Sequence, residues 1–252
     1  MSARTKDVLT NILNVRKNID ETCRAVGRDP RHVRLLLATK TVPVNVIEQC
    51  ILNGHTLFAE NKVQELLGKV DSLSGLEYES HFIGHLQSNK VRQVIHHVKC
   101  IHSIDRLSLV KELNKRLTQH ELTMKALVQV NTSGEESKFG IEPDRLASFL
   151  EEISHYPAIQ IEGLMTIGFF SSSDDKVRPC FRLLRELSEQ TDCSHYSNIR
   201  LQELSMGMSN DYVTAIQEGA TIVRVGTSIF GQREHPDSYY WDEGPKAQDR
   251  HH

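Results

Sequence analysis

The chain has 252 residues, of which 38% are hydrophobic and 25% charged, a balance typical of a folded globular protein and not of a disordered or fibrous one. Its formal net charge is -3, from 30 basic and 33 acidic residues, which excludes the strong positive field of a protein that collects nucleic acid or anionic membranes. The five cysteines are odd in number and widely spaced, so they indicate neither a disulfide framework nor a zinc site and favour a reducing, cytoplasmic setting.

The N-terminal segment is predicted to form one amphipathic helix over about residues 5–27. Its apolar residues recur with a helical period, beginning at Val8 and Leu9, and Gly27 can end the helix. The segment is polar and has no long apolar run, so it has the character neither of a secretory signal nor of a membrane span. We therefore expect no membrane association.

From residue 33 onward, short apolar runs that predict buried strands alternate with helical segments. The first run, HVRLLLATK, precedes PVNVIEQCILNG, in which Pro43 and Gly54 mark the start and the end of a helix. Seven further strand candidates follow along the chain: TLFAEN, YESHFIG, CIHSID, KALVQVNT, IQIEGLMTIG, LQELSMG and TIVRVGTSIFG.

Eight strands that alternate with helices in about 250 residues predict a closed (β/α)8 barrel. We expect the barrel over about residues 33–231, within one domain that spans residues 1–252 and ends in a polar tail, 234–252. A doubly wound open sheet is the alternative, but it would need a glycine-rich loop after its first strand. The chain has TKTVPVN there, which counts against a dinucleotide site.

The functional groups of such a barrel lie at the C-terminal ends of its strands and in the loops that follow them. Lys40 ends the first apolar run, and strand alternation places it on one face with Leu36 and Ala38. If this face lines the lumen, a desolvated Lys40 amine can form a Schiff base with an aldehyde. A strand-end lysine that reaches solvent is the simpler alternative.

The last two strands end in segments rich in glycine and hydroxyl groups, residues 205–212 and 223–231. Barrels commonly hold phosphate at these two strand ends, where backbone N–H groups and helix N-termini are available. We therefore predict a phosphate-binding group that consists of Ser205, Ser209, Gly226 and Thr227.

Arg224 interrupts the otherwise apolar eighth strand and is expected to point into the barrel with Ile222 and Gly226. There its guanidinium could donate to a ring nitrogen or a carboxylate. An ion pair with Glu162 or Glu203 inside the barrel is the structural alternative.

Other strand ends add polar or sulfur side chains to the same rim, namely Asn61, His81, His85, Asn131, Met165 and Thr166. With 13 histidines in the chain, His81 and His85 are better explained as ordinary, partly buried side chains. His96 and His97 are adjacent on a predicted helix and cannot face one ion together, so we predict no metal site. Lys138 lies in a charged loop, where a solvated position is expected.

Seven segments that fall at predicted strand ends follow one another across roughly residues 33–231: LLLATKTVP, FAENKVQEL, HFIGHLQSNKV, VNTSGEESKFGI, GLMTIG, LSMGMSNDY and VRVGTSIFG. Together they resemble the pyridoxal phosphate homeostasis protein family. The resemblance implies a barrel like the N-terminal domain of alanine racemase, with pyridoxal 5′-phosphate attached to Lys40 as a Schiff base and its pyridine nitrogen beside Arg224. The residues that it implies in cofactor binding are Lys40, Asn61, Met165, Ser205, Ser209, Arg224, Gly226 and Thr227.

We expect a cytoplasmic monomer that holds, buffers and delivers pyridoxal phosphate to apo-enzymes, with neither nucleic acid nor membrane as a partner. An enzyme similar to alanine racemase needs a second base from a C-terminal β domain, whereas this chain ends soon after its eighth strand. An arginine beside the pyridine nitrogen also weakens the cofactor as an electron sink. A racemase or decarboxylase of low activity is the alternative hypothesis, and a Schiff-base aldolase for sugar phosphates is the third.

Overall fold

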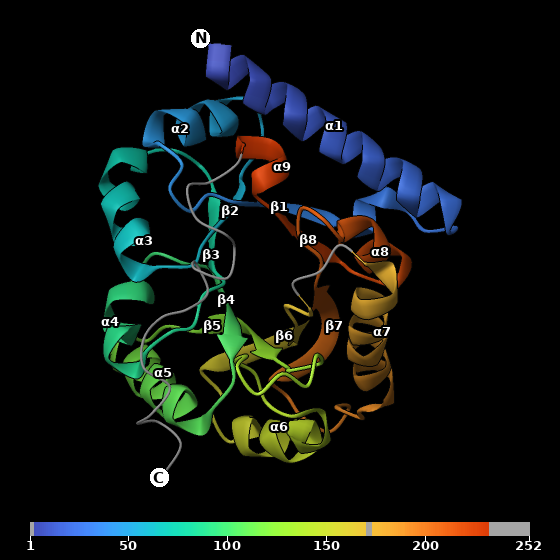
Figure 1. The fold of residues 1–252 in the computed structure, drawn as a ribbon. Coiled ribbons are helices and arrows are strands. Elements are labelled where there is room, and N and C mark those ends of the chain that lie inside the picture. The colour runs from blue at the N-terminus through green and yellow to red at the C-terminus, as the bar shows by residue number, and fades with distance from the viewer. Residues whose placement is uncertain (1–2, 170–172, 232–252) are drawn as a thin grey trace.

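The computed structural model describes residues 3–169 and 173–231, in which eight parallel strands close into a barrel (Figure 1). The strands pair in chain order, and β8 returns to pair with β1. Their bounds are β1 (Arg34–Ala38), β2 (Leu57–Glu60), β3 (Glu79–Phe82), β4 (Cys100–Ile104), β5 (Met124–Gln129), β6 (Ile159–Met165), β7 (Ile199–Ser205) and β8 (Ile222–Val225). The predicted (β/α)8 barrel is confirmed, whereas the predicted tail, 234–252, lies outside the described residues.

Helices occupy the connections between strands and surround the barrel (Figure 1). The α-helices are α1 (Ala3–Ala25), α2 (Val44–Leu52), α3 (Val63–Val70), α4 (Val91–Val94), α5 (Leu107–Gln119), α6 (Leu146–Ser154), α7 (Asp174–Gln190), α8 (Tyr212–Gln217) and α9 (Thr227–Phe230). Short 3-10 turns cover Pro30–His32, Asp71–Leu73, Ser88–Lys90 and Pro143–Arg145.

Three elements end earlier than the sequence predicts. The helix expected in NKVRQVIHHV is reduced to a 3-10 turn and the single turn of α4, because β-branched residues and histidines have low helix propensity. The first strand ends at Ala38, so Lys40 lies in the turn after it. The eighth strand ends at Val225, and the following residues form the short helix α9.

The extra N-terminal helix, α1, packs beside the two helices that follow β7 and β8 (Figure 1). Asn11 Nδ2 donates a hydrogen bond to the carbonyl of Ile229 (3.0 Å), next to the end of α9. Asn18 Nδ2 donates to the Tyr212 hydroxyl (3.1 Å) at the start of α8. The helix therefore supports the elements that carry the predicted phosphate-binding residues.

The strands divide the buried side chains into an outer core and a lumen. Leu35 and Leu37 of β1 belong to the large core between strands and helices. Leu36 and Ala38 instead form a small separate cluster with residues of neighbouring strands, as the alternation of β1 predicts: Ala59, Ile83 and Ile222. A second small cluster contains Cys100, Leu127 and Met165.

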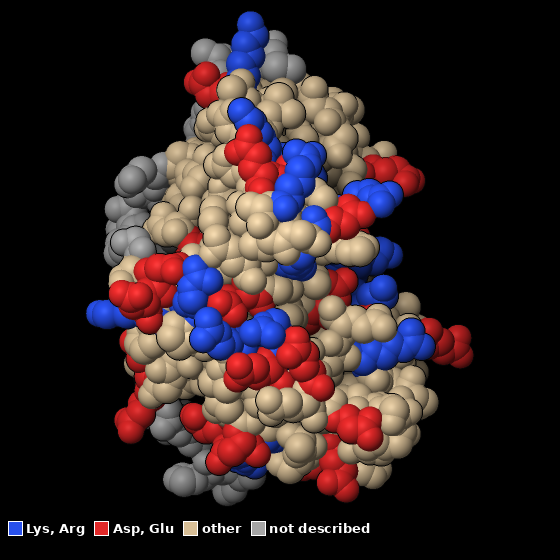
Figure 2. All heavy atoms as spheres, turned by 90° about the vertical axis from the view of Figure 1, so that its right-hand side faces the viewer, with Lys and Arg blue, Asp and Glu red and all other residues tan. Residues whose placement is uncertain are grey.

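The face over α1, α7 and α8 carries interleaved basic and acidic side chains and no single-sign patch (Figure 2). Directly after α8, the buried Glu218 carboxylate is shared by three arginines of α7, with N–O distances of 3.0, 3.2 and 3.5 Å: Arg178, Arg182 and Arg185. In the described part of the chain, no helix combines the length and the apolar character that crossing a membrane requires.

Candidate functional site

Lys40 is buried just beyond β1, at 3% exposure, so the alternative of a lysine that reaches solvent is wrong. Because β1 pairs with β8 and β2, this residue lies between the strand ends that carry Arg224 and Asn61. The ammonium of Lys69, on α3, donates to the carbonyls of Thr39 (3.2 Å) and Lys40 (3.4 Å). The Lys69 side chain thus ties the backbone of this turn to α3.

Arg224 points into the barrel and is 2% exposed, with Leu36 of β1 opposite it in the ladder. Its Nη1 donates to Ser205 Oγ (2.8 Å) and its Nη2 to the carbonyl of Thr166 (2.8 Å). The third nitrogen, Nε, is buried and its N–H has no hydrogen-bond acceptor in the described structure. Burial lowers the pKa of Arg224 to about 10, so the guanidinium remains charged at neutral pH.

The alternative of an ion pair between Arg224 and Glu162 or Glu203 is wrong, because the guanidinium bonds to Ser205 and Thr166 instead. Glu203 lies near Arg34 instead, with 3.9 Å between Oε1 and Nη2, and also accepts a hydrogen bond from the Thr221 hydroxyl. The charge of Arg224 therefore faces a hydroxyl and a carbonyl, both neutral acceptors.

The predicted phosphate-binding residues fall into two groups. Ser209 Oγ accepts hydrogen bonds from the backbone N–H groups of Gly226 (3.3 Å) and Ser228 (3.2 Å), which flank Thr227 at the start of α9. Ser205 lies at the end of β7, fully buried, and bonds to Arg224 and His102. The structure brings Ser209, Gly226 and Thr227 together and places Ser205 with the luminal polar groups.

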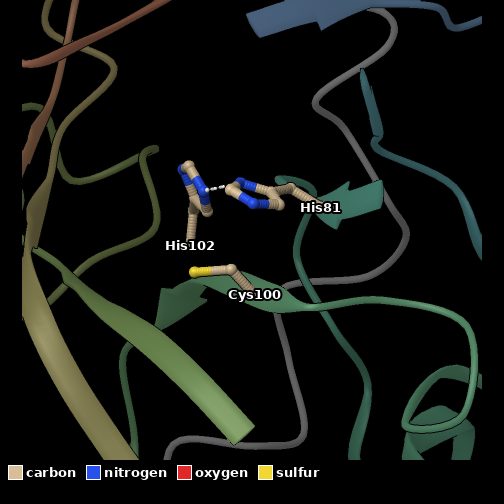
Figure 3. Close-up of side chains that lie close together, drawn as sticks. All are labelled: His81, Cys100 and His102. Atoms are coloured by element: carbon tan, nitrogen blue, oxygen red, sulfur yellow. Dashed lines mark hydrogen bonds between the residues drawn. The ribbon is translucent and has the colours of Figure 1, made fainter. Parts of the chain in front are cut away.

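Two histidines and a cysteine meet in the lumen, with their ligand atoms within 4.8 Å of one another (Figure 3). His81 comes from β3, while Cys100 and His102 come from β4. His81 Nδ1 and His102 Nε2 are 2.8 Å apart and share a hydrogen bond. The other ring nitrogens bond to Glu79 Oε1 (2.6 Å) and Ser205 Oγ (3.0 Å), so every ring nitrogen of the pair has a partner.

His81 was expected to be an ordinary, partly buried side chain, but it is 1% exposed and shares a hydrogen bond with His102, a residue that the sequence-based expectations did not include. The available signal was the histidine at an alternate position with Cys100 in a short, otherwise apolar strand. Burial lowers the pKa of both imidazoles, and for His102 the neighbouring His81 and the charge of Arg224 lower it further. Both rings are therefore neutral at pH 7.

The two expected ring neighbours, Asn61 and Met165, are buried at the ends of β2 and β6. The backbone of Asn61 is approached closely by Gly84, where a Cβ atom would lie 1.9 Å from the Asn61 carbonyl oxygen. Only glycine fits this contact without backbone movement. Met165 lies next to Thr166, whose carbonyl accepts the hydrogen bond from Arg224 Nη2.

The remaining candidates have structural contacts. His85 stacks on Phe139, with ring centroids 3.9 Å apart, and Asn131 Nδ2 donates to the carbonyl of Glu135 (3.1 Å). The expected solvated position of Lys138 is wrong: its side chain is 12% exposed, pairs with Glu135 and donates to the carbonyl of Gly168.

Comparison with known proteins relates the chain to a family of this fold. Residues 11–234 match the family described as alanine racemase, N-terminal domain. The chain is 42% identical over 221 residues to the pyridoxal phosphate homeostasis protein of Aquifex aeolicus, covering 88% of this chain and 96% of that one.

Two solved structures resemble the whole barrel. An unknown protein from Bifidobacterium adolescentis has a TM-score of 0.84 and 34% identity, covering 91% of this chain and 97% of that chain. PipY of Synechococcus elongatus, solved with PLP bound, has a TM-score of 0.72 and 32% identity, covering 84% of this chain and 100% of that chain.

Proposed function

Since the chain belongs to the pyridoxal phosphate homeostasis protein family, we propose that it binds pyridoxal 5′-phosphate at the C-terminal end of its barrel. One observation carries the proposal. Arg224 is a buried cation with an unused N–H donor, and it lies on the strand next to the one that leads to Lys40. A fixed donor of this kind suits the lone pair of an unprotonated pyridine nitrogen. PipY, a relative at 32% identity, has PLP bound in its structure.

The phosphate of the cofactor is proposed to bind at Ser209, Gly226 and Thr227. Two backbone N–H groups converge there on the Ser209 hydroxyl oxygen, and among the described residues the hydroxyl hydrogen has no acceptor, so it can donate to a phosphate oxygen. A phosphate oxygen needs hydrogen-bond donors such as this hydroxyl. The support from α1 and the short loops makes the site largely preformed.

Lys40 is proposed to hold the cofactor covalently, with Asn61 and Met165 beside the ring. When bound, the cofactor supplies an aldehyde carbon with which a lysine amine forms a Schiff base. Lys40 is 3% exposed, so bulk water is largely kept away from the proposed point of attachment. The hydrogen bonds from Lys69 to the Thr39 and Lys40 carbonyls keep the turn in place.

We further propose that the protein carries and delivers the cofactor without efficient catalysis. Arg224 stays protonated at neutral pH, so it donates to the ring nitrogen and leaves the nitrogen without a proton of its own. A carbanion next to an unprotonated ring gains little stabilisation. The names of the curated relatives, which describe homeostasis, agree with this role.

Covalent attachment is tested by absorption spectroscopy and peptide mapping after borohydride reduction. The purified protein should absorb visible light because of the Schiff base, and Lys40→Ala should remove that band. Lys62→Ala, at a lysine near the same rim, is the control and should keep it. A label on Lys62 or Lys138 in the wild type would contradict the assignment of Lys40.

Delivery is tested by mixing the loaded protein with an apo-enzyme that requires pyridoxal phosphate and following the return of its activity. In parallel, the loaded protein is screened for racemisation and decarboxylation of common L- and D-amino acids. We expect transfer and only slow chemistry. Turnover at about 1 per second or faster, typical of metabolic enzymes, would place the protein among the enzymes instead.

A further inference from the structure

A continuous column of hydrogen bonds runs through the lumen from Arg224 to Glu79. The successive contacts are Arg224 Nη1 to Ser205 Oγ (2.8 Å), Ser205 Oγ to His102 Nδ1 (3.0 Å), His102 Nε2 to His81 Nδ1 (2.8 Å) and His81 Nε2 to Glu79 Oε1 (2.6 Å). Between its two ends, the column consists of groups that are at most 1% exposed. It therefore links the candidate site to the opposite end of the barrel.

The two ends of the column determine where every proton lies. A guanidinium can only donate hydrogen bonds, and an ionised carboxylate can only accept them. His81 must therefore carry its hydrogen on Nε2, toward Glu79, which leaves Nδ1 as an acceptor. His102 must then donate from Nε2 to His81, which leaves its own Nδ1 as an acceptor. Only the Ser205 hydroxyl can donate to that nitrogen.

The protonation states of the column agree with this assignment. The pKa of Glu79 is lowered, mainly by its hydrogen bond with His81, which keeps the carboxylate ionised at neutral pH. Burial lowers the pKa of His81 and His102, so each neutral ring carries one N–H. Arg224 remains charged. A neutral ring between a fixed donor and a fixed acceptor has only one compatible tautomer.

We propose that His81 and His102 are positioning residues whose shared tautomer commits the Ser205 hydroxyl hydrogen to His102, so that Ser205 holds Arg224 in place and does not donate to the phosphate. The second part rests on the proposed function, whereas the tautomers do not. Ser205 accepts from Arg224 and donates to His102, so it has no hydrogen left for an anion. This assignment separates it from Ser209, whose oxygen accepts two backbone N–H bonds.

The tautomers are measured in the cofactor-free protein by long-range ¹H–¹⁵N NMR of labelled histidines at pH 7, with assignments from His81→Gln and His102→Gln. We expect both rings to be neutral and protonated at Nε2. A hydrogen on Nδ1 of His102, or a positive charge on either ring, would overturn the proposal. Because no cofactor is present, this result does not depend on whether the protein binds pyridoxal phosphate.

The role of Ser205 is measured with two matched variants, Ser205→Ala and Ser209→Ala, through their dissociation constants for pyridoxal phosphate and for unphosphorylated pyridoxal. Ser209→Ala should weaken the phosphorylated ligand by about tenfold more than pyridoxal, because it removes a bond to a charged group. Ser205→Ala should weaken both ligands by the same factor and shift the absorption maximum of the bound ring. A selective loss of the phosphorylated ligand in Ser205→Ala would overturn the proposal.

If the wild type binds neither ligand, the proposed function fails, and the NMR measurement alone decides whether the column has the assigned protons. If the wild type binds both and His102 carries its hydrogen on Nδ1, the proposed function stands and the positioning role fails. The two results are thus distinguishable.

Discussion

Lys69 is a buried cation that holds the turn next to the proposed cofactor lysine. Its Nζ lies 2.7 Å from Glu60 Oε1, and burial raises the pKa of that carboxyl while Lys69 and Thr39 act in the opposite direction. Removing one partner of a buried ion pair leaves an uncompensated charge. We therefore expect Lys69→Met to lower the free energy of unfolding by about 3–5 kcal/mol, measured by urea denaturation followed by circular dichroism.

The double variant Glu60→Gln with Lys69→Met should recover part of this loss, since no unpaired charge is left. Lys17→Met is the control, because Lys17 is 73% exposed and lies 3.8 Å from Glu21. It should change the unfolding free energy by no more than about 0.5 kcal/mol. Equal losses in Lys17→Met and Lys69→Met would contradict the role of burial.

Among the elements, α8 depends on a side chain that follows α1. The guanidinium of Arg28 donates to the carbonyl of Ile216 (2.6 Å) in the last turn of this short helix, and to the carbonyls of Gly219 (3.3 Å) and Ala220 (2.8 Å) just after it. Hydrogen bonds from a charged donor contribute about 1.5–3 kcal/mol each, so we expect Arg28→Met to destabilise the protein by about 2–3 kcal/mol.

The local effect of Arg28→Met should appear as faster amide hydrogen exchange in α8, since an end without a cap opens more often. Arg24→Met, four residues earlier, is the matched control. Arg24 is 68% exposed and its Nη2 lies 3.6 Å from Asp20, so its loss should leave exchange in α8 unchanged. Faster exchange in both variants would indicate a general effect of removing charge from this segment.

For the whole molecule, the two luminal histidines make stability depend on pH. Their pKa values are lowered in the folded chain, whereas the unfolded chain takes up protons with an ordinary histidine pKa near 6.5. The contribution of these two histidines to the free energy of unfolding is therefore fully present above about pH 6.5. It is lost as the pH falls below this value, by up to about 1.4 kcal/mol per pH unit for each histidine. Urea denaturation between pH 7.5 and 5.5 measures the slope.

In His102→Gln, the unfolding free energy should depend less steeply on pH than in the wild type, because the contribution of one histidine is removed. The exposed His195 provides the control, and His195→Gln should leave the slope unchanged. A His102→Gln slope equal to that of the wild type would mean that the luminal ring becomes charged without cost in the folded protein.

At the same scale, the fold could be predicted from the sequence because strand alternation and helical period are local patterns. Leu36 and Ala38 indicate the luminal face of β1, and Arg224 in an apolar strand indicates an inward cation. The different partners of Ser205 and Ser209, Arg224 for the first and the backbone of Gly226 for the second, could not be predicted. They depend on the turn between the two serines, in which Gly207 has a φ of 89°. The contact of Lys69 with Glu60 depends on how α3 docks, which no local pattern specifies.

The seam between β1 and β8 joins the beginning of the barrel to its end, with Arg34 opposite Ile222, and α1 packs on α8 and α9. During ribosomal synthesis, one edge of β1 therefore stays unpaired until β8 has been made. The apolar side of α1 likewise stays uncovered until α8 and α9 have formed. Unpaired edges and uncovered apolar faces promote aggregation. Nascent chains that stop before β8 should therefore be clients of chaperones, and the release of the full chain from the ribosome should be the step that makes this protein independent of them.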